Sequence, residues 1–570
     1  MILLFAALGI VYAQAPTRPT LPQKTVILTL PKQGTSTCPT LTTGSNCIRN
    51  VPAGNSTSLR NAINAATCGD TIVLVAGSTY SGNFTIPSTS CSGWIVIESS
   101  AVASLPSPGN RVGPSNASDM AIISTPNSSS AIQFNANSNH WRIIGCEITT
   151  SVSNSSGIVY YLVAMGETIT SLSQLPSYII FDRTYIYGSA VTPIQHGIGM
   201  DGAFIGVVDS YCDEIVDSGA DSQCLFAYNG SGPFLIQNNF LQATGENIMF
   251  GGADPAITNL IPSDITVIGN LFQKNVAAWR GVISDVKNHF ELKNAQRVLL
   301  DGNVLQYTWA AGQSESIIIR SVDQQGSCSW CVAQDVTITH NLIQHVPQGI
   351  ELVSDQSCAA EGGCLPTVRV LVRNNVFVDV SPTNWGGSHG QVVGLQGDGG
   401  PYTMHDVTVD HNTAFQDNIT TGPPYNAFVY FNGGGVVVNI QFTNNLSNYG
   451  TNSSGGYTGD TYYAGTQTFE YYTSNLTYND DVLINVSGSS NGYPPYPSGT
   501  YWNTTSGVGF TNYPGGNYQL TSSSPYYQAG TDGKDIGVWD WTCLNNDSTA
   551  ALVGTFVPGP GGCALSGNLQ

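Results

Sequence analysis

Short apolar strands alternate with polar turns along most of this chain, and one such pattern returns seven times between residues 234 and 448. Each copy is an apolar strand with period-two alternation that ends at an Asn and is followed by a second apolar pair, as in ITVIGNLFQ (265–273). The aligned residues, spaced by 31, 33, 38, 34, 37 and 33 positions, are Asn239, Asn270, Asn303, Asn341, Asn375, Asn412 and Asn445. A repeat of this length without helical periodicity predicts a solenoid of strands.

The recurring Asn has a physical explanation. Asn tolerates the left-handed backbone region at a sharp turn, and its side-chain amide can hydrogen-bond to the Asn of the next coil. Earlier, less regular coils carry Cys146, Thr184 and Ser210 at this position. We therefore expect a ladder of stacked side chains along about ten to twelve coils, at roughly 4.8 Å per coil. The alternative is that Asn is simply common in the turns of secreted β proteins.

The chain divides into four parts by composition. Residues 1–15 form an apolar segment that ends in small residues, which is typical of a secretory signal peptide, although no basic residues precede it. Residues 16–50 are rich in Pro and Thr and are interpreted as an N-terminal arm or linker. Residues 51–545 form the solenoid, with a short amphipathic capping helix near its start and Tyr- and Gly-rich coils and loops near its end. Residues 546–570 are interpreted as a C-terminal tail.

Charge narrows the range of partners. The 570 residues include 17 Lys and Arg against 37 Asp and Glu, a net charge of −20. Such a chain has no general attraction for nucleic acid or an anionic membrane, and no segment reaches the ~20 apolar residues of a membrane span. An anionic polysaccharide could still bind, but only at a local cluster of positive charge. Self-association remains open, and 13 Asn-X-Ser/Thr sequons allow glycosylation in a host that performs it.

The chain has 13 cysteines, which an exported protein is free to pair. The spacing suggests five disulfides, namely Cys38 with Cys47, Cys68 with Cys91, Cys328 with Cys331, Cys358 with Cys364, and Cys543 with Cys563. Of the remaining Cys146, Cys212 and Cys224, at least one must be unpaired. We expect the odd thiol to be buried, because a small thiol packs well near the ladder position.

These features resemble a known family. The coils, and the run GENIMFGGADP…NHFELKNAQRVLLDGN (245–303) in particular, resemble the right-handed parallel β-helix of the pectate-lyase-like superfamily and a set of uncharacterised secreted bacterial β-helix repeat proteins. The resemblance implies an all-β, single-stranded right-handed parallel β-helix. It does not fix an activity, because this superfamily includes lyases, hydrolases, esterases, adhesins and tailspikes. Neither the Asp-rich calcium set of pectate lyases nor the paired Asp residues of polygalacturonases is present in full.

A second strand precedes the ladder strand in each coil, and its alternation separates an inner from an outer face. The expected inward pairs are Ile198/Met200, Cys224/Phe226, Ile248/Phe250, Phe290/Leu292, Ile317/Ile319, Ile350/Leu352, Val393/Leu395 and Phe428/Tyr430. The outward column then brings Lys293 and Arg320 together on neighbouring coils, with Glu291 and Glu351 two coils apart. We expect these four to be catalytic residues. The substrate-binding candidates around them are Asp201, Glu246, Asn247, Arg280, Lys287 and Gln396.

Three interpretations of this patch remain. In a polysaccharide lyase, Lys293 or Arg320 would act as base or neutralise the uronate, and Glu291 with Glu351 could hold Ca²⁺. In a hydrolase, Glu291 and Glu351 would form a pair of carboxyl groups. In a non-catalytic structural or adhesive surface protein, the four would form only a salt-bridge ladder. The lyase is preferred to the hydrolase, and an enzyme should have a cleft with walls formed by the loops 251–264, 321–335 and 354–367.

Overall fold

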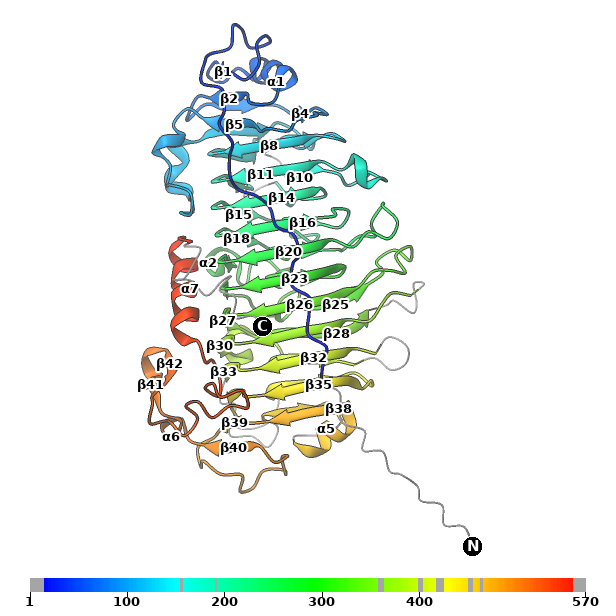
Figure 1. The fold of residues 1–570 in the computed structure, drawn as a ribbon, viewed down its shortest axis with the longest axis vertical. Helices are drawn as coiled ribbons and strands as arrows, with labels where there is room; N and C mark the ends of the chain where they lie inside the picture. The colour runs from blue at the N-terminus through cyan, green and yellow to red at the C-terminus, as the bar shows by residue number, and fades with distance from the viewer. Residues whose placement is uncertain are drawn as a thin grey trace.

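The computed structural model describes residues 15–153, 157–189, 192–356, 363–397, 403–416, 425–449, 455–461 and 465–556. The predicted signal peptide lies almost entirely outside this part of the chain. The described chain winds into an upright stack of coils, each of which contributes one strand to each of three long parallel sheets (Figure 1). Consecutive strands of one coil enter sheets 1, 2 and 3 in turn. The fold is therefore a right-handed parallel β-helix, as the repeat predicts.

The strands are short, and each sheet adds one strand per coil. Sheet 1 contains β1 (Ile48–Val51), β2 (Thr71–Leu74), β5 (Ile95–Ser99), β8 (Asn139–Ile144), β11 (Ser177–Asp182), β14 (Ala203–Val208), β17 (Phe234–Gln237), β20 (Ser263–Ile268), β23 (Ala295–Asp301), β26 (Ala333–Thr339), β29 (Val368–Arg373), β32 (His405–Asp410), β35 (Val437–Thr443) and β38 (Thr473–Asn479). Sheet 2 contains β3 (Thr79–Ser81), β6 (Ala121–Thr125), β9 (Cys146–Thr150), β12 (Tyr185–Tyr187), β15 (Tyr211–Ile215), β18 (Phe240–Ala243), β21 (Leu271–Gln273), β24 (Val304–Gln306), β27 (Leu342–Val346), β30 (Val376–Val380), β33 (Thr413–Gln416), β36 (Leu446–Asn448), β39 (Asp481–Ile484) and β40 (Thr500–Asn503). Sheet 3 contains β4 (Phe84–Ile86), β7 (Ile132–Phe134), β10 (Val159–Met165), β13 (Ile194–Gly199), β16 (Gln223–Ala227), β19 (Ile248–Phe250), β22 (Phe290–Leu292), β25 (Glu315–Val322), β28 (Gln348–Gln356), β31 (His389–Gln396), β34 (Tyr425–Asn432) and β37 (Tyr457–Gly459).

The stack is taller than expected. Sheets 1 and 2 each have 14 strands, so the prediction of ten to twelve coils was too low. The missed coils are those at the ends, where the sequence departs from the Asn pattern. At the usual spacing between strands, 14 strands span about 65 Å.

The predicted ladder is present from Asn239 to Asn445. Asn270 Oδ1 accepts the backbone N–H of Asn239 at 2.8 Å and its side-chain Nδ2–H at 3.0 Å. The same pair of bonds joins each later Asn to the next. Asp481 closes the ladder by accepting the backbone N–H of Asn445 at 2.6 Å. Earlier in the stack, hydroxyl groups replace the amides. Ser210 Oγ accepts the backbone N–H of Thr184 at 3.0 Å, and Ser210 donates its own backbone N–H to Asn239 Oδ1 at 2.9 Å.

One part of the explanation for Asn was wrong. The left-handed residue in each turn is the one before the ladder Asn, such as Asn238 (φ 54°), His340 (φ 53°) or Gly302 (φ 62°). The ladder position itself is therefore selected for its amide group, which is both donor and acceptor. The preceding position is selected for backbone freedom.

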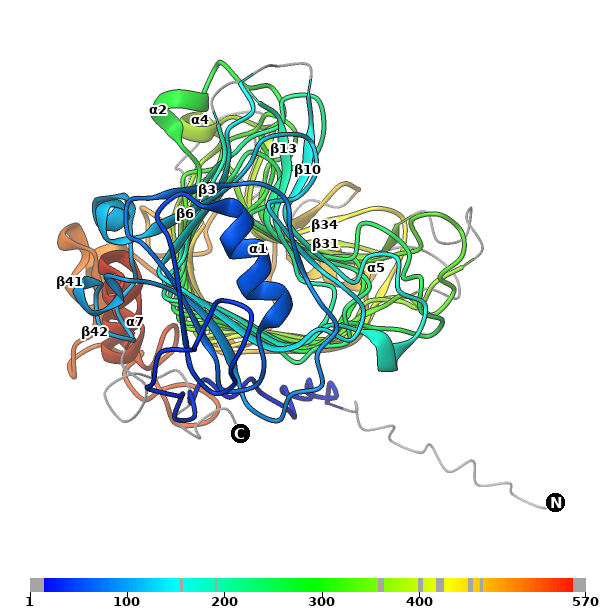
Figure 2. The same cartoon turned by 90° about the horizontal axis from the view of Figure 1, so that it is seen from above.

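Each end of the stack receives a helix. Helix α1 (Ser56–Ala65) lies across the N-terminal opening, as Figure 2 shows, and buries Leu59, Ala62 and Ile63. Asn55 caps this helix by accepting the Ser58 N–H at 2.9 Å. Helix α1 lies where the sequence predicts a short capping helix. At the other end, α5 (Thr466–Tyr472) buries Phe469 and Tyr472 against the last coils.

The N-terminal arm runs in an extended form along sheet 1, seen as the dark blue trace in Figure 1. The backbone N–H groups of Thr17, Thr20 and Gln23 donate to Asp406, Asp335 and Asp264, at 2.8, 2.9 and 2.8 Å. These aspartates lie on β32, β26 and β20, which are every second strand of the sheet. Three extended residues cover about 10 Å, and two strand spacings cover nearly the same distance, so the arm and the stack have matching repeats.

Three predicted disulfides are confirmed, namely Cys38–Cys47, Cys68–Cys91 and Cys328–Cys331. Cys358 and Cys563 lie outside the described residues, so their two pairings stay predictions. A further disulfide joins Cys212 to Cys224, and Cys146 is the buried free thiol.

The chain returns beside the stack after the last coil. The remaining elements are α6 (Thr505–Val508), the antiparallel hairpin β41 (Phe510–Asn512) and β42 (Asn517–Leu520), and α7 (Trp541–Val553), which packs against the sheet 2 side through Leu544 and Ala551. Two short helices, α2 (Val276–Trp279) and α4 (Pro382–Trp385), project from the coils. In the described part of the chain, no helix combines the length and apolar character needed to cross a bilayer.

Candidate functional site

The outer face of sheet 3 brings the four predicted catalytic residues together. Glu291 pairs with Ile318, and Ile318 pairs with Glu351, so the two glutamates lie two coils apart in one column. Lys293 and Arg320 follow one side of this column on neighbouring strands. The four residues therefore lie close together on the outer side of three successive strands.

The register differs from the prediction at two strands. Leu225 and Ala227 pair with Ile248 and Phe250 and face the core, so the inward prediction was wrong for Phe226, whereas Cys224 belongs to the core cluster. Likewise Val429 and Phe431 face the core, so the inward prediction was wrong for Tyr430, whereas Phe428 belongs to the core cluster. Both strands are apolar at consecutive positions, so a period of two could not select the face. The second correction turns Tyr430 towards the outer surface.

Glu291 lies between the two cations. Its side chain is fully buried, and its Oε1 accepts the Arg320 Nε–H at 2.8 Å and lies 3.6 Å from Lys293 Nζ. Arg320 also bonds this oxygen through Nη2, and Asn288 donates to the other oxygen at 3.0 Å. Burial alone would raise the pKa of Glu291, but Arg320 and Lys293 outweigh it and hold the pKa at about 2. Glu291 is therefore an ionised anchor for the two cations.

A second acid lies beside this cluster. Glu246 is buried, accepts the Gln223 amide at 2.5 Å, and has Lys287 Nζ at 4.0 Å from its other oxygen. Burial, with the nearby Glu291 and Asp221, raises the pKa of Glu246 to about 7. Lys287 itself pairs with Asp221.

A cavity of about 540 Å³ opens next to Arg320, over β25, β28, β31 and β34. The groups in it that can carry charge or transfer a proton are Glu315, Arg320, Glu351, His389, Tyr430 and Asp460. Its walls are not the predicted loops. The segments before β25 and β31 and residue Asp460 line it, whereas none of the described residues of 251–264, 321–335 and 354–367 does. Loops 251–264 and 321–335 bind each other instead, through three backbone N–H groups that donate to Asp254.

Glu351 forms part of this cavity and is 6% exposed. Its two oxygens accept amide N–H groups from Gln391 at 2.6 Å and from Asn432 at 3.1 Å. Burial, with the charge of Glu315, raises the pKa of Glu351 to about 8. A carboxyl group with this pKa is mostly protonated at neutral pH, so Glu351 can donate a proton. It differs from Glu291, which lies on the same face and stays ionised.

The other acidic and aromatic groups of the cavity complete its chemistry. Burial raises the pKa of Glu315. The Tyr430 hydroxyl donates to Asp460 at 2.5 Å, and its ring lies 4.8 Å from that of His389. Burial lowers the pKa of His389, which favours the neutral imidazole.

The remaining predicted residues are scattered. Gln396 is exposed and lines the cavity. Asn247 is buried and accepts from Lys274 Nζ at 2.6 Å, inside the corner between sheets. Arg280 lies over the Trp385 ring at 5.0 Å and does not line the cavity. Asp201 is buried and caps a turn by accepting the N–H of Tyr228 at 2.8 Å.

Several cavity residues escaped the sequence analysis. Gln391, Asn432 and Asp460 come from coils that are 40 to more than 100 positions beyond Glu351 in the chain. Tyr430 was assigned to the core by the register error. The sequence did contain one signal. Strands β31 and β34 have polar residues at their ends and apolar residues at their centres, which indicates that the ends lie at an open surface.

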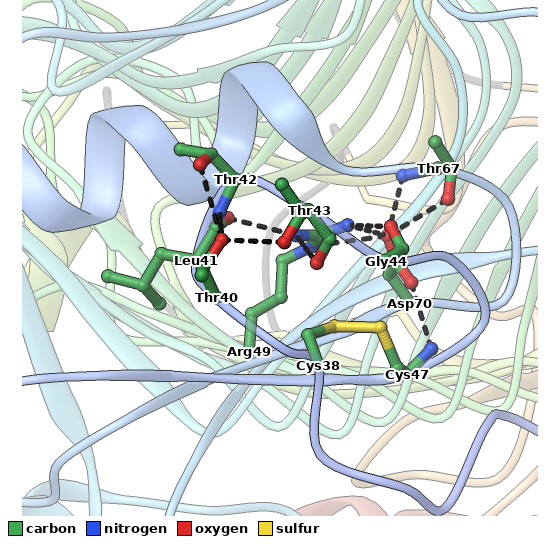
Figure 3. The surroundings of a disulfide bond; sticks show 10 residues. All are labelled: Cys38, Thr40, Leu41, Thr42, Thr43, Gly44, Cys47, Arg49, Thr67 and Asp70. Carbon is green, nitrogen blue, oxygen red and sulfur yellow. Dashed lines mark hydrogen bonds and ion pairs between the residues drawn. A yellow bond between two sulfur atoms is a disulfide. The ribbon is translucent and has the colours of Figure 1, made fainter.

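The predicted calcium site does not fit the residues present. The Glu291 carboxylate is engaged by Arg320 and Lys293, and the two oxygens of Glu351 accept from Gln391 and Asn432, so the two glutamates do not offer a pair of free oxygens. Within the described ranges, the one group of three metal-ligating side chains comprises Cys38, Cys47 and Asp70. Figure 3 shows these cysteines joined as a disulfide, with Asp70 bonded to Arg49 at 2.8 Å, so this group is also structural.

Among the solved structures that match this chain, three are by title two lyases and a glucanase. An alginate lyase from Paenibacillus sp. str. FPU-7 is 11% identical, with a TM-score of 0.30 over 80% of this chain and 99% of that one. A mannuronic acid specific polysaccharide family 6 lyase from human gut microbiota is 10% identical, with a TM-score of 0.44 over 79% and 92%. The catalytic unit of a GH87 alpha-1,3-glucanase from Streptomyces thermodiastaticus is 12% identical, with a TM-score of 0.42 over 84% and 72%.

No family model matches the chain, and no curated protein matches it either. The likenesses to solved structures concern architecture alone. By the topology of its own three parallel sheets, the chain has a right-handed parallel β-helical fold.

Proposed function

We propose that this protein binds an extracellular polysaccharide along the outer face of sheet 3 and cleaves it in the cavity, with Glu351 as the proton donor. The carrying observation is a buried carboxyl group with a pKa of about 8 in the wall of a cavity of about 540 Å³. A cavity of this size accommodates a few sugar residues. Perturbed acids in a cleft are a recurring feature of catalytic sites.

Proton donation is the step that the site supports best. Breaking a glycosidic bond requires a proton for the departing oxygen, whether the reaction is hydrolysis or elimination. Glu351 carries this proton at neutral pH, and Gln391 and Asn432 fix its orientation through one hydrogen bond to each oxygen. After donation, the same two amides stabilise the carboxylate.

The charge of the cavity favours hydrolysis of a neutral polysaccharide. Arg320 is the permanent cation among the lining residues, and Glu291 already neutralises it. Glu315 and Asp460 add acidic groups to the same cavity. A uronate would therefore meet no spare positive charge, whereas a second carboxylate could activate water against a neutral sugar.

Elimination from a uronate is the second candidate, and one observation favours it. Lys293 and Arg320 both contact Glu291 Oε1, and their side chains are 12% and 13% exposed. If the substrate carboxylate displaced Glu291 from Arg320, Arg320 could neutralise the acid, and Lys293, once it had released its own proton to solvent, could take the adjacent proton. The extra cost is the separation of a buried ion pair.

A product assay separates these candidates. The purified protein is incubated with neutral and uronate-containing polysaccharides, and the products are analysed for new reducing ends and for the ultraviolet absorbance of an unsaturated uronate. Reducing ends without that absorbance indicate hydrolysis, and both together indicate elimination. Glu351→Gln should abolish either reaction, and Glu470→Gln, at an exposed position on α5, should leave it unchanged. Absence of cleavage across the panel would favour the structural or adhesive alternative.

A further inference from the structure

A larger cavity lies elsewhere on the molecule. It has a volume of about 770 Å³ and lies between the ends of β33, β36 and β39 in sheet 2 and the segment from α6 through β41. The hairpin β41–β42 lies on the opposite side of the stack from β31 and β34, as Figure 2 shows. The two cavities share no lining residue.

The lining of this sheet 2 cavity is polar but uncharged. Side-chain amides and hydroxyls come from coils and from the returning segment, including Gln416, Asn448, Thr505 and Thr511. No Asp, Glu, Lys, Arg or His belongs to the described lining. An ionic ligand would therefore lose its hydration without gaining a counter-charge. A ligand rich in neutral hydroxyl groups would find donors and acceptors instead.

Aromatic rings form one wall of the cavity. Tyr513 is 37% exposed and stacks on Phe510, with ring centroids 5.6 Å apart and planes inclined by 27°. Phe415 supports both rings in edge-on contacts, at 5.8 Å from Phe510 and 5.1 Å from Tyr513. The Tyr513 ring is thus held in place while one part of it stays open to solvent. A fixed, partly exposed ring with a polar tip suits the apolar face of a sugar ring.

A buried amide adds a second observation. Gln416 lines the cavity and is 7% exposed, and its Nε2 has no hydrogen-bond partner among the described residues. The backbone of Gln416 is fixed, because Asn448 Oδ1 accepts its N–H at 2.7 Å and Asn448 Nδ2 donates to its carbonyl at 2.7 Å. An unpaired buried donor costs about 1–3 kcal/mol, so a small side-chain rotation towards a ligand acceptor would recover this free energy.

We propose that the sheet 2 cavity is a carbohydrate-binding site for neutral oligosaccharides, separate from the cleavage site. Tyr513 provides the stacking surface, and the surrounding amides and hydroxyls bond the sugar hydroxyls. The site would hold a polysaccharide on one side of the stack while sheet 3 stays accessible on the other. This inference does not depend on catalysis by Glu351, because the two sites have no residue in common.

The test is a binding measurement on the catalytically silenced protein. The Glu351→Gln protein is titrated in a calorimeter with neutral gluco-, xylo- and manno-oligosaccharides. Uronate oligosaccharides are titrated in the same way as the charged comparison. We expect binding of at least one neutral oligosaccharide and a loss of about tenfold or more in affinity when Tyr513→Ala is added. Tyr527→Ala is the matched control, because Tyr527 is 40% exposed and lies outside the cavity lining.

A second variant separates loss of the ligand site from loss of folding. Tyr513→Phe retains the ring and should retain most of the affinity, and thermal unfolding should show that all variants are folded. In the wild-type background, Tyr513→Ala should leave cleavage of short soluble substrates unchanged. The proposal is overturned if no neutral oligosaccharide binds, if only uronates bind, or if Tyr513→Ala binds as well as the control.

Discussion

Gly394 lies directly against the carboxyl group of Glu351, on the next strand of sheet 3. A Cβ atom placed on Gly394 would lie 1.7 Å from Glu351 Oε2. The space that glycine leaves is therefore occupied by the carboxyl group of Glu351, the proposed proton donor. The absence of one side chain on β31 makes room for the functional group of β28.

The first prediction is that Gly394→Ala removes activity by displacing Glu351. The added methyl group must push the carboxyl out of its position between Gln391 and Asn432, and overpacking of this kind costs about 1–3 kcal/mol. We expect at least a tenfold loss of cleavage rate, measured from reducing ends. Gly434→Ala is the control, because no atom lies within 4 Å of its added Cβ. Unchanged activity in Gly394→Ala would contradict the placement of Glu351 in the reaction.

The second prediction concerns pH. Burial raises the pKa of Glu351 to about 8, so the folded protein keeps a proton that the unfolded chain releases near pH 4.5. The stabilisation from this proton is complete below about pH 4.5 and declines as the pH rises to about 8, by at most about 1.4 kcal/mol per pH unit. Glu351→Gln should abolish this decline and raise the melting temperature relative to wild type at pH 8. Parallel melting profiles for the two proteins from pH 5 to 9 would show that Glu351 is not the titrating group.

The third prediction concerns the buried ion cluster. Arg320→Met leaves the Glu291 charge buried with Lys293 as its remaining cation, and loss of one partner of such a pair costs about 3–5 kcal/mol. We expect a large fall in stability in chemical denaturation. The double variant Glu291→Gln, Arg320→Met removes both charges and should recover part of the loss. A double variant that is less stable than Arg320→Met would mean that Glu291 does not depend on Arg320 for its charge.

The fourth prediction concerns the ladder. The Asn303 side chain accepts from Asn270 and donates to Asn341 Oδ1 and to two backbone carbonyls. Asn303→Ala leaves these buried groups without partners, at about 1–3 kcal/mol for each unsatisfied group, so we expect a drop in melting temperature of several degrees. Asn64→Ala on the exposed face of α1 is the comparison and should change little. Equal melting temperatures for the two variants would remove the energetic role of the ladder.

The fifth prediction concerns the N-terminal arm. Thr20→Pro removes the N–H that donates to Asp335, whereas Thr20→Ala retains it. A hydrogen bond to a charged group contributes about 1.5–3 kcal/mol, so the Pro variant should release the arm locally. Hydrogen exchange and limited proteolysis of residues 15–30 should increase in Thr20→Pro and not in Thr20→Ala. Equal protection in both variants would show that the strand-by-strand match of arm and sheet does not hold the arm.

The sequence alone determined the architecture of this protein, because each coil repeats the same strands and turns at nearly the same spacing along the chain. The register of Asn270, Asn303 and Asn341 predicted the stack, and the alternation around Glu291 predicted its column on sheet 3. The local pattern gave the wrong orientation for Phe226 and Tyr430. These residues lie in strands that are apolar at successive positions, so only the pairing with neighbouring coils decides which side chains point inward.

Only the tertiary structure decided the chemistry of the site. Glu291 and Glu351 look alike in the sequence, yet one has a pKa of about 2 and the other of about 8. The pKa values differ because Arg320 and Lys293 lie beside Glu291, whereas Glu351 is buried among neutral amides and near the acidic Glu315. The residues that surround each glutamate come from distant parts of the chain. The pKa of a carboxyl group depends on its burial and on all the charges near it, so it is set only when the chain has folded.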